Sequence, residues 1–172
     1  MQTAGILAMN AAQLANAGEA AAARSVLLRL VGSSFAPSGA GLTNDWRGSG
    51  WTRQGAPDLD IGVNLGFASA VTECIVQSNS NALKVLPAVF PEIAVGRITD
   101  IATDFAARVS MEWDINRGRC QIKIMPKMNC VIDVYVPKEF SRIKTKELNF
   151  DREQGCIKGL NLTAGKIVVI EF

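Results

Sequence analysis

The chain has 172 residues, of which 48% are hydrophobic and 20% are charged, and its formal net charge is +2. This composition is ordinary for a globular protein with one sizeable core, and the small charge argues against association with nucleic acid or an anionic membrane. No uninterrupted apolar run is long enough to cross a bilayer. We therefore expect no nucleic-acid partner and no membrane partner.

The first part of the chain predicts a pair of helices. Residues 3–17 are rich in Ala, Leu and Gln, which are good helix formers, and Gly18 ends this run. A second helix is expected over residues 19–31, because apolar residues recur there at helical spacing. The short turn between the two segments predicts an antiparallel pair.

A long loop over residues 33–63 is dense in Ser, Gly and Pro. Loops of this length inside a compact domain are usually functional or partly disordered. Our candidate substrate-binding residues are Trp46, Trp51, Asp58, Asp60 and Asn64. An aromatic ring can stack on the apolar face of a sugar, and carboxylate and amide groups can bind its hydroxyls. The alternative is structural: the Trp residues pack the loop, the Asp residues form turns, and Asn64 caps a helix.

A third helix is expected over residues 65–78, with Asn64 as its N-cap, because apolar residues there follow an i, i+3, i+4 pattern. Residues 82–95 then form a connector, in which Pro87 and Pro91 prevent a continuous helix. Residues 1–81 are therefore expected to form a helical segment.

From residue 96 onward the hydrophobic period changes to two. Val109, Met111 and Trp113 alternate with polar residues, and a similar alternation recurs over 120–124 and 130–136. The last predicted hairpin covers residues 155–162 and 165–172. We expect residues 96–172 to form an antiparallel β-sandwich, which gives an α+β fold with two to three N-terminal helices.

The chain has no histidine, and its four cysteines are widely spaced without a CxxC pair. A Ser-His-Asp triad, a Cys-His pair and a His-based metal site are therefore impossible within it, and we expect no metal and no cofactor. Buried free thiols are the expected state. Because Cys120 and Cys130 lie on strands that can be neighbours, a disulfide between them stays open.

Three consecutive segments carry a family resemblance. They are APDLDIGVNLG at residues 56–66, CIVQS at 74–78 and VLPAVFP at 85–91. They resemble HPPFQIDGNFG, LLQS and LLPALP at the join between the helical barrel and the C-terminal β domain of glycoside hydrolase family 95, the α-L-fucosidases. The later segments VGRITDI and ARVSMEW resemble the family's VKGLRA and FEVDIEW. The resemblance implies that the helices are a remnant of an α/α toroid. It also suggests an exported or periplasmic parent protein, although the N-terminal residues lack the pattern of a signal peptide.

The polar positions of the family loop are lost in this chain. Gly62 stands where the family has its catalytic-loop Asp, Ala56 stands where it has His, and Asp60 stands where it usually has Gln. Inverting glycoside cleavage needs one carboxyl group as acid and a second group that activates water. The resemblance implies that the acid is a Glu on an upstream barrel helix, so we expect no catalytic residue in this chain.

The resemblance therefore implies a C-terminal fragment of an α-L-fucosidase-like glycoside hydrolase that is inactive alone and whose partner is an upstream catalytic barrel. The alternative is a non-catalytic carbohydrate-binding or structural module that dimerises through its helical face. A third option is an unrelated α+β protein whose dimer interface is the helical block. The few helices cannot hide all their apolar faces against one face of a small sandwich. We expect them either to pack across that face or to leave an exposed apolar patch, which would drive assembly.

Overall fold

The computed structural model describes residues 4–43, 58–140, 143–144 and 148–172. The chain divides into two compact units, a helical unit (Met1–Ile75) and a β unit (Val76–Phe172). The predicted α+β class, with helices before a mainly antiparallel β-sandwich, is confirmed. None of the helices in the described residues is long and apolar enough to span a membrane.

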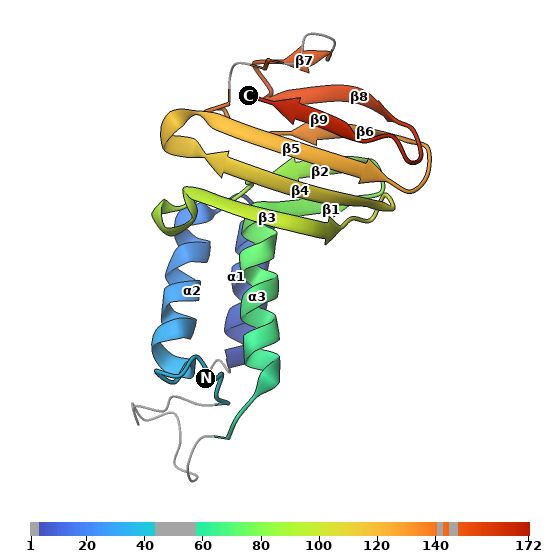
Figure 1. The fold of residues 1–172 in the computed structure, drawn as a ribbon. Helices are drawn as coiled ribbons and strands as arrows, with labels where there is room; N and C mark the ends of the chain where they lie inside the picture. Colours follow the sequence, from blue (N-terminus) through green and yellow to red (C-terminus); the bar gives the residue numbers. More distant parts are fainter. Residues whose placement is uncertain (1–3, 44–57, 141–142, 145–147) are drawn as a thin grey trace. The chain divides into compact units, whose positions relative to one another are not determined.

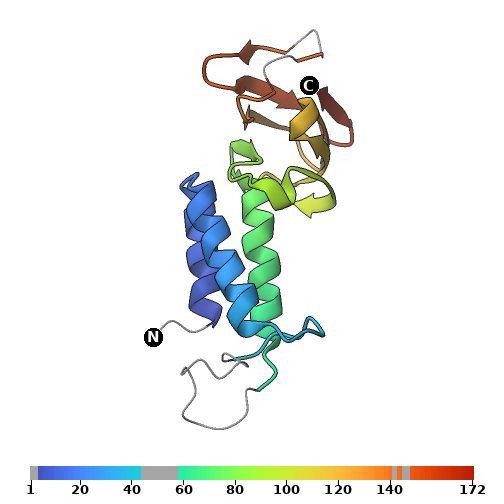
Figure 2. The ribbon, with the colours of Figure 1, turned by 90° about the vertical axis from the view of Figure 1, so that its left-hand side faces the viewer.

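The helical unit consists of α1 (Ala4–Asn16), α2 (Ala20–Ser34) and α3 (Ile61–Ile75), which run alongside one another (Figure 2). The predicted turn between the first two helices is confirmed: the backbone at Gly18 has a φ of 77°, which glycine adopts without strain. Helices α1 and α2 are antiparallel, and α3 lies along α1 in the same direction.

Small residues let α1 and α3 approach closely. The buried side of α1 presents alanines one helical turn apart, and a Cβ built on Gly66 of α3 would lie 3.0 Å from the Cβ of Ala8. Larger side chains fill the remaining space: Leu7, Leu30 and Val63 belong to one buried cluster, against which Phe35 and Phe67 pack. Each fully buried Leu or Val contributes about 1.5–3 kcal/mol to folding.

The third helix lies earlier in the chain than the sequence predicts. It covers Ile61–Ile75 rather than residues 65–78, and Val76–Asn79 forms strand β1 instead of its last turn. The first residues of the predicted connector, Ala82–Val85, form strand β2 and pair with β1 as an antiparallel hairpin. The boundary between the units therefore falls at Ile75, and not near residue 81.

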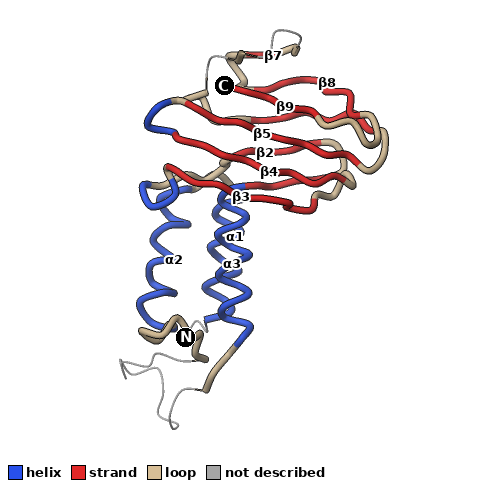
Figure 3. Tube along the Cα trace, in the orientation of Figure 1, coloured by secondary structure: helices blue, strands red, loops and turns tan. Residues whose placement is uncertain are grey.

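The β unit contains two sheets. One has the strand order β1-β2-β6-β8-β7 and the other has the order β3-β4-β5-β9. Figures 1 and 3 show them as two layers. The remaining strands are β3 (Val95–Ala102), β4 (Ala107–Asp114), β5 (Arg119–Pro126), β6 (Cys130–Tyr135), β7 (Phe150–Asp151), β8 (Cys156–Leu162) and β9 (Val168–Glu171). The predicted alternation is clearest in β4 and β5, whose every second residue is buried.

One strand pair departs from the expected antiparallel arrangement. Strands β2 and β6 are parallel, with Leu83 opposite Val134 and Lys84 opposite Tyr135. The other pairs in both sheets are antiparallel. The long chain between β2 and β6 makes the parallel pairing feasible, because a parallel pair needs a crossover rather than a tight turn.

Trp113, one of the alternating apolar residues of β4, is buried in the sandwich, since only 4% of this residue is exposed. Its indole N–H donates a hydrogen bond to the carbonyl of Ile93 at 2.8 Å. A Cβ built on Gly96, which is opposite Trp113 on β3, would lie 2.5 Å from the indole ring, so only glycine leaves room for the ring.

All four cysteines are free thiols, and Cys74, Cys120 and Cys156 are buried as predicted. Cys120 lies on β5 and Cys130 on β6, which belong to different sheets. The disulfide that the sequence leaves open between them is therefore not formed.

Candidate functional site

The predicted site residues that the structure describes gather at the start of α3. Asp60 is the N-cap of this helix: its carboxylate accepts a hydrogen bond from the N–H of Gly62 at 2.8 Å, and its carbonyl accepts one from Val63. The backbone N–H of Asp60 donates to the carbonyl of Gly41. Asp60 thus fixes both the start of the helix and its link to the preceding loop.

Asn64 is not the N-cap that the sequence predicts, because it lies one turn inside α3. Its amide oxygen accepts a hydrogen bond from the N–H of Gly41 at 2.8 Å, and its amide nitrogen donates to the carbonyl of Gly39 at 2.9 Å. Asn64 therefore holds the turn over residues 39–41 against the helix. Both polar ends of its side chain are used in this contact.

Asp58 lies beside this turn and is exposed. Its backbone carbonyl accepts a hydrogen bond from Thr43, next to the bridge between Leu42 and Leu59. The structure thus brings Asp58, Asp60 and Asn64 close to one turn, and their role as sugar contacts stays a prediction. Trp46 and Trp51 lie outside the described residues.

Large apolar side chains surround the start of α3. Leu59 and Ile61 are each 78% exposed, and Leu65 is 64% exposed. On α1, Met9 is 56% exposed. Single exposed apolar residues are normal on a protein surface, whereas contiguous apolar patches are typical of interaction sites.

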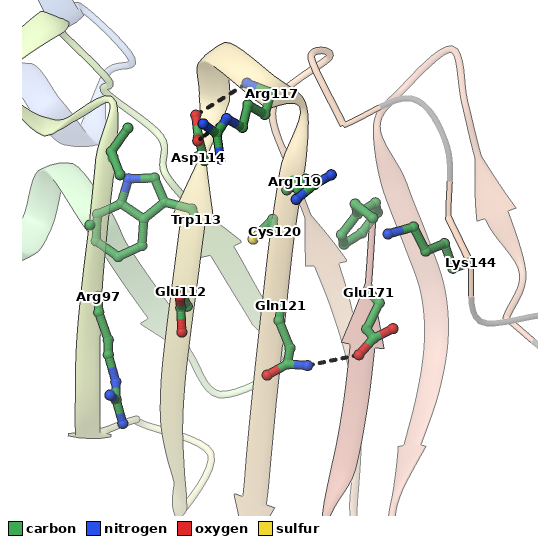
Figure 4. Close-up of a pocket in the computed structure, with 13 residues that line it drawn as sticks. Arg97, Glu112, Trp113, Asp114, Arg117, Arg119, Cys120, Gln121, Lys144 and Glu171 are labelled. Carbon is green, nitrogen blue, oxygen red and sulfur yellow. Dashed lines mark hydrogen bonds and ion pairs between the residues drawn. The ribbon is translucent and has the colours of Figure 1, made fainter.

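A second candidate region lies on the outer face of the sheet β3-β4-β5-β9 in the β unit (Figure 4). We call it the sheet-face depression; it has a volume of about 740 Å³ and is lined from Val95 and Arg97 on β3 to Glu171 and Phe172 at the end of the chain. Four polar residues in mutual register form a row across all four strands: Arg97, Glu112, Gln121 and Glu171.

Ion pairing within the sheet-face depression is incomplete. Gln121 donates a hydrogen bond to Glu171 at 2.7 Å, and Asp114 pairs with Arg117 at 3.4 Å. Arg97 and Arg119 have exposed side chains without a partner among the described residues.

The lining aromatic residues Trp113 and Phe172 are only 4% and 3% exposed, so they present no open ring. This region can bind a ligand through charge and hydrogen bonds, but not through stacking.

The sequence did not lead us to predict this row, although it carries a signal for it. Glu112 and Gln121 occupy the exposed positions of the alternating strands β4 and β5. Alternation alone predicts which face each side chain occupies, but the register that aligns the four strands depends on long-range pairing.

A third region is a depression of about 700 Å³ in the β unit, which we call the connector depression. It is lined by the end of β2, residues 85–94, the β4–β5 turn and residues 135–139. In contrast to the sheet-face depression, it includes an exposed aromatic residue, Tyr135, which is 39% exposed.

Two of the buried thiols are poor nucleophiles. Burial raises the pKa of Cys120, which lines the sheet-face depression, to about 12. Burial and the neighbouring Glu73 raise the pKa of Cys74 to about 11. Because the thiolate is the reactive form, both groups are unreactive at neutral pH.

Cys156 lies opposite Tyr135 in the β6–β8 pair. The charge of Cys156 in its ionised form, together with burial, raises the pKa of the Tyr135 hydroxyl. Burial also raises the pKa of Cys156. Both groups therefore stay protonated at neutral pH.

Within the described residues, no group of three or more His, Cys, Asp or Glu side chains could hold a metal ion. Comparison with known proteins assigns no family: no protein-family model matches the chain, and no curated protein matches it at a significant level.

Proposed function

We propose that this chain is the C-terminal part of a glycoside hydrolase related to family 95, an α-L-fucosidase-like protein of carbohydrate metabolism. The observation that carries the proposal is the exposure of large apolar side chains on the helical unit, at Met9, Leu28, Ile61 and Leu65. A toroid of paired helices covers such side chains with the neighbouring pairs. The order of the units agrees with the resemblance, because α3 passes directly into the β unit at Ile75.

The proposal assigns no hydrolytic activity to the chain alone. Gly62 occupies the place of the family's catalytic-loop Asp and lies in the first turn of α3. The neighbouring carboxylate of Asp60 is used as a helix cap. Hydrolysis with inversion needs two groups on opposite faces of the sugar, and the resemblance places its acid on a helix upstream of these residues.

The first test measures catalysis by the chain alone. We expect the purified protein to release no nitrophenol from p-nitrophenyl α-L-fucoside above the buffer rate. Turnover that survives repeated purification would contradict the assignment of Gly62 as a lost catalytic position.

The second test measures assembly with a barrel. The chain is co-expressed with a tagged helical barrel from a family 95 α-L-fucosidase that has been cut before its last loop. We expect the chain to co-purify with the tagged barrel. The Leu65→Lys substitution should abolish co-purification, whereas Gln13→Lys, at an exposed polar position of α1, should have little effect on it. Failure of the unaltered chain to bind would count against the proposal.

The same exposed residues favour a second candidate function, a non-catalytic carbohydrate-binding or structural module that dimerises through its helical face. Light scattering after size exclusion separates the two. A dimer that Leu65→Lys converts to a monomer supports the second function, whereas a monomer that binds the barrel supports the first.

A further inference from the structure

The connector depression has the size of a small-molecule site. Its volume of about 700 Å³ lies within the range of roughly 300–1,000 Å³ that is usual for ligand pockets. All of its lining residues belong to the β unit. Its properties therefore do not depend on the helical unit or on the loop that precedes α3.

The floor of the connector depression is apolar and stiff. Val85 and Leu86 are each 2% exposed, and three proline residues contribute to the lining. Leu86 has a φ of 52°, a left-handed conformation that is strained for a residue with a Cβ. Such strain persists where surrounding structure holds it, and it occurs often at binding sites.

Two aromatic residues line the same depression. Tyr135, at the end of β6, is 39% exposed, and Phe90 is half-buried. Tyr135 is in register with Lys84 on the parallel strand β2, so the two side chains leave neighbouring strands at the same level of the sheet. An exposed ring beside a hydrogen-bonding group can hold a ligand that has one apolar face and polar edges.

The polar groups of the lining are balanced in charge. Lys84, Asn116 and Glu139 have exposed side chains, and among the described residues none of the three has a side-chain partner. The ammonium only donates, the carboxylate only accepts, and the amide does both. A sugar hydroxyl both donates and accepts, so this mixture suits several hydroxyl groups, whereas a polyanion would need an excess of cations.

We propose that the connector depression binds a neutral pyranose, whose C–H face lies on the ring of Tyr135 and whose hydroxyls bind Lys84, Asn116 and Glu139. The proposal rests on the carbohydrate-related function proposed above but needs neither the family assignment nor the residues near α3. A site of this size for one or two sugar rings is expected to bind in the millimolar range.

The test uses saturation-transfer NMR on the whole chain with methyl α-L-fucopyranoside, methyl β-D-galactopyranoside and methyl α-D-glucopyranoside. We expect transfer to at least one glycoside, with affinity reduced roughly tenfold in Tyr135→Ala, equivalent to about 1.4 kcal/mol. Tyr135→Phe, which keeps the ring, should retain binding. Gln121→Ala in the sheet-face depression is the matched control and should also retain it.

A second variant, called the rim variant, separates loss of binding from loss of folding. It is needed because Tyr135 also lies opposite the buried Cys156. Lys84→Ala combined with Glu139→Ala changes only exposed side chains, and it should weaken binding while the circular dichroism spectrum stays unchanged. Absence of transfer to all three glycosides would overturn the site, as would binding that neither the Tyr135→Ala nor the rim variant weakens.

Three outcomes decide between this proposal, a different site and the proposed function. If a glycoside binds and only Asp58→Ala weakens it, the sugar lies near α3; the carbohydrate function then stands and the connector site falls. If a proline-rich decapeptide binds the connector depression and the glycosides do not, the site is a peptide groove and the present proposal is wrong. Sugar binding at Tyr135 without barrel binding would support the site and remove the family proposal.

Discussion

The amide oxygen of Asn64 accepts a hydrogen bond from the backbone N–H of Gly41 at 2.8 Å, across 23 positions in the sequence. Because Gly41 is buried and a Cβ there would lie 2.5 Å from that oxygen, the contact requires glycine on one side and a short amide on the other. The pair ties the end of the 39–41 turn to α3.

Replacing Asn64 with alanine removes this bond and the one to the carbonyl of Gly39. We expect the free energy of unfolding to fall by about 1–2 kcal/mol, because a buried N–H loses its acceptor. Urea unfolding followed by circular dichroism measures the change. Asn16→Ala, at an exposed helix position, is the control and should change stability by less than about 0.5 kcal/mol. Equal effects of the two substitutions would show that the Gly41 contact contributes little.

The N-cap of α3 gives a second prediction. Asp60→Ala should lower the free energy of unfolding by about 1 kcal/mol, because the N–H of Gly62 loses its acceptor. Asp60→Asn should retain most of the stability that the cap contributes. Thermal unfolding measures both. Asp58→Ala alters an exposed carboxylate two residues away and should have little effect. An equally large loss from Asp58→Ala would argue against Asp60 as the cap.

Replacing either of two glycines with positive φ by alanine should lower the free energy of unfolding, but by clearly different amounts. Gly165 has a φ of 74° with open space around its Cβ position, so Gly165→Ala should cost about 1 kcal/mol. Gly155 has a φ of 61°, and a Cβ there would lie 2.6 Å from the carbonyl oxygen of Val136, so Gly155→Ala should cost about 3 kcal/mol. Urea unfolding of both variants tests the difference. Similar losses would mean that the Val136 carbonyl moves aside easily.

Asp151 predicts a pH dependence of stability. Hydrogen bonds from the backbone of Gln154 and from Lys158 lower the pKa of Asp151 below its ordinary value of 3.8. A folded-state pKa below the unfolded one gives stability that is fully present above about pH 4 and is lost as pH falls through the folded value. Asp151→Asn should therefore flatten the fall of the melting temperature below pH 4. Asp104→Asn, at an exposed carboxylate, should leave that fall unchanged.

The thiols should differ in reactivity towards iodoacetamide at pH 8. Cys130 is half-buried, whereas Cys120 is buried and has a pKa of about 12. Peptide mass spectrometry should find Cys130 alkylated first in the native protein and all four cysteines alkylated in urea. Native labelling of Cys120 as fast as that of Cys130 would contradict the burial of the Cys120 side chain on β5.

The parts of the fold that follow from local patterns could be predicted. Helices α1 and α2 follow from propensity and periodicity, and β4 and β5 follow from strict alternation through Val109 and Ile122. The end of α3 could not be predicted, because the apolar run through Val76 continues the helical pattern. Only pairing with β2, which in turn pairs with β6, makes Val76–Asn79 a strand.

The candidate sites, too, could be predicted only as far as local sequence patterns determine them. Asp60 and Asn64 are both plausible caps, and they lie one helical turn apart. What separates them is that Asn64 binds Gly39 and Gly41, a contact that no local pattern reveals. The connector depression joins Lys84, Asn116 and Tyr135 from distant parts of the sequence, so its composition became visible only with the strand order.

The parallel pairing of β2 with β6 has a consequence for how the protein is made. On the ribosome, the β1–β2 hairpin emerges before β3, β4 and β5, and all of these precede β6, the strand that pairs with β2. Until β6 has left the exit tunnel, one edge of the hairpin stays open to pairing with other nascent chains. Translation speed over residues 86–130 should therefore affect the yield of properly assembled protein.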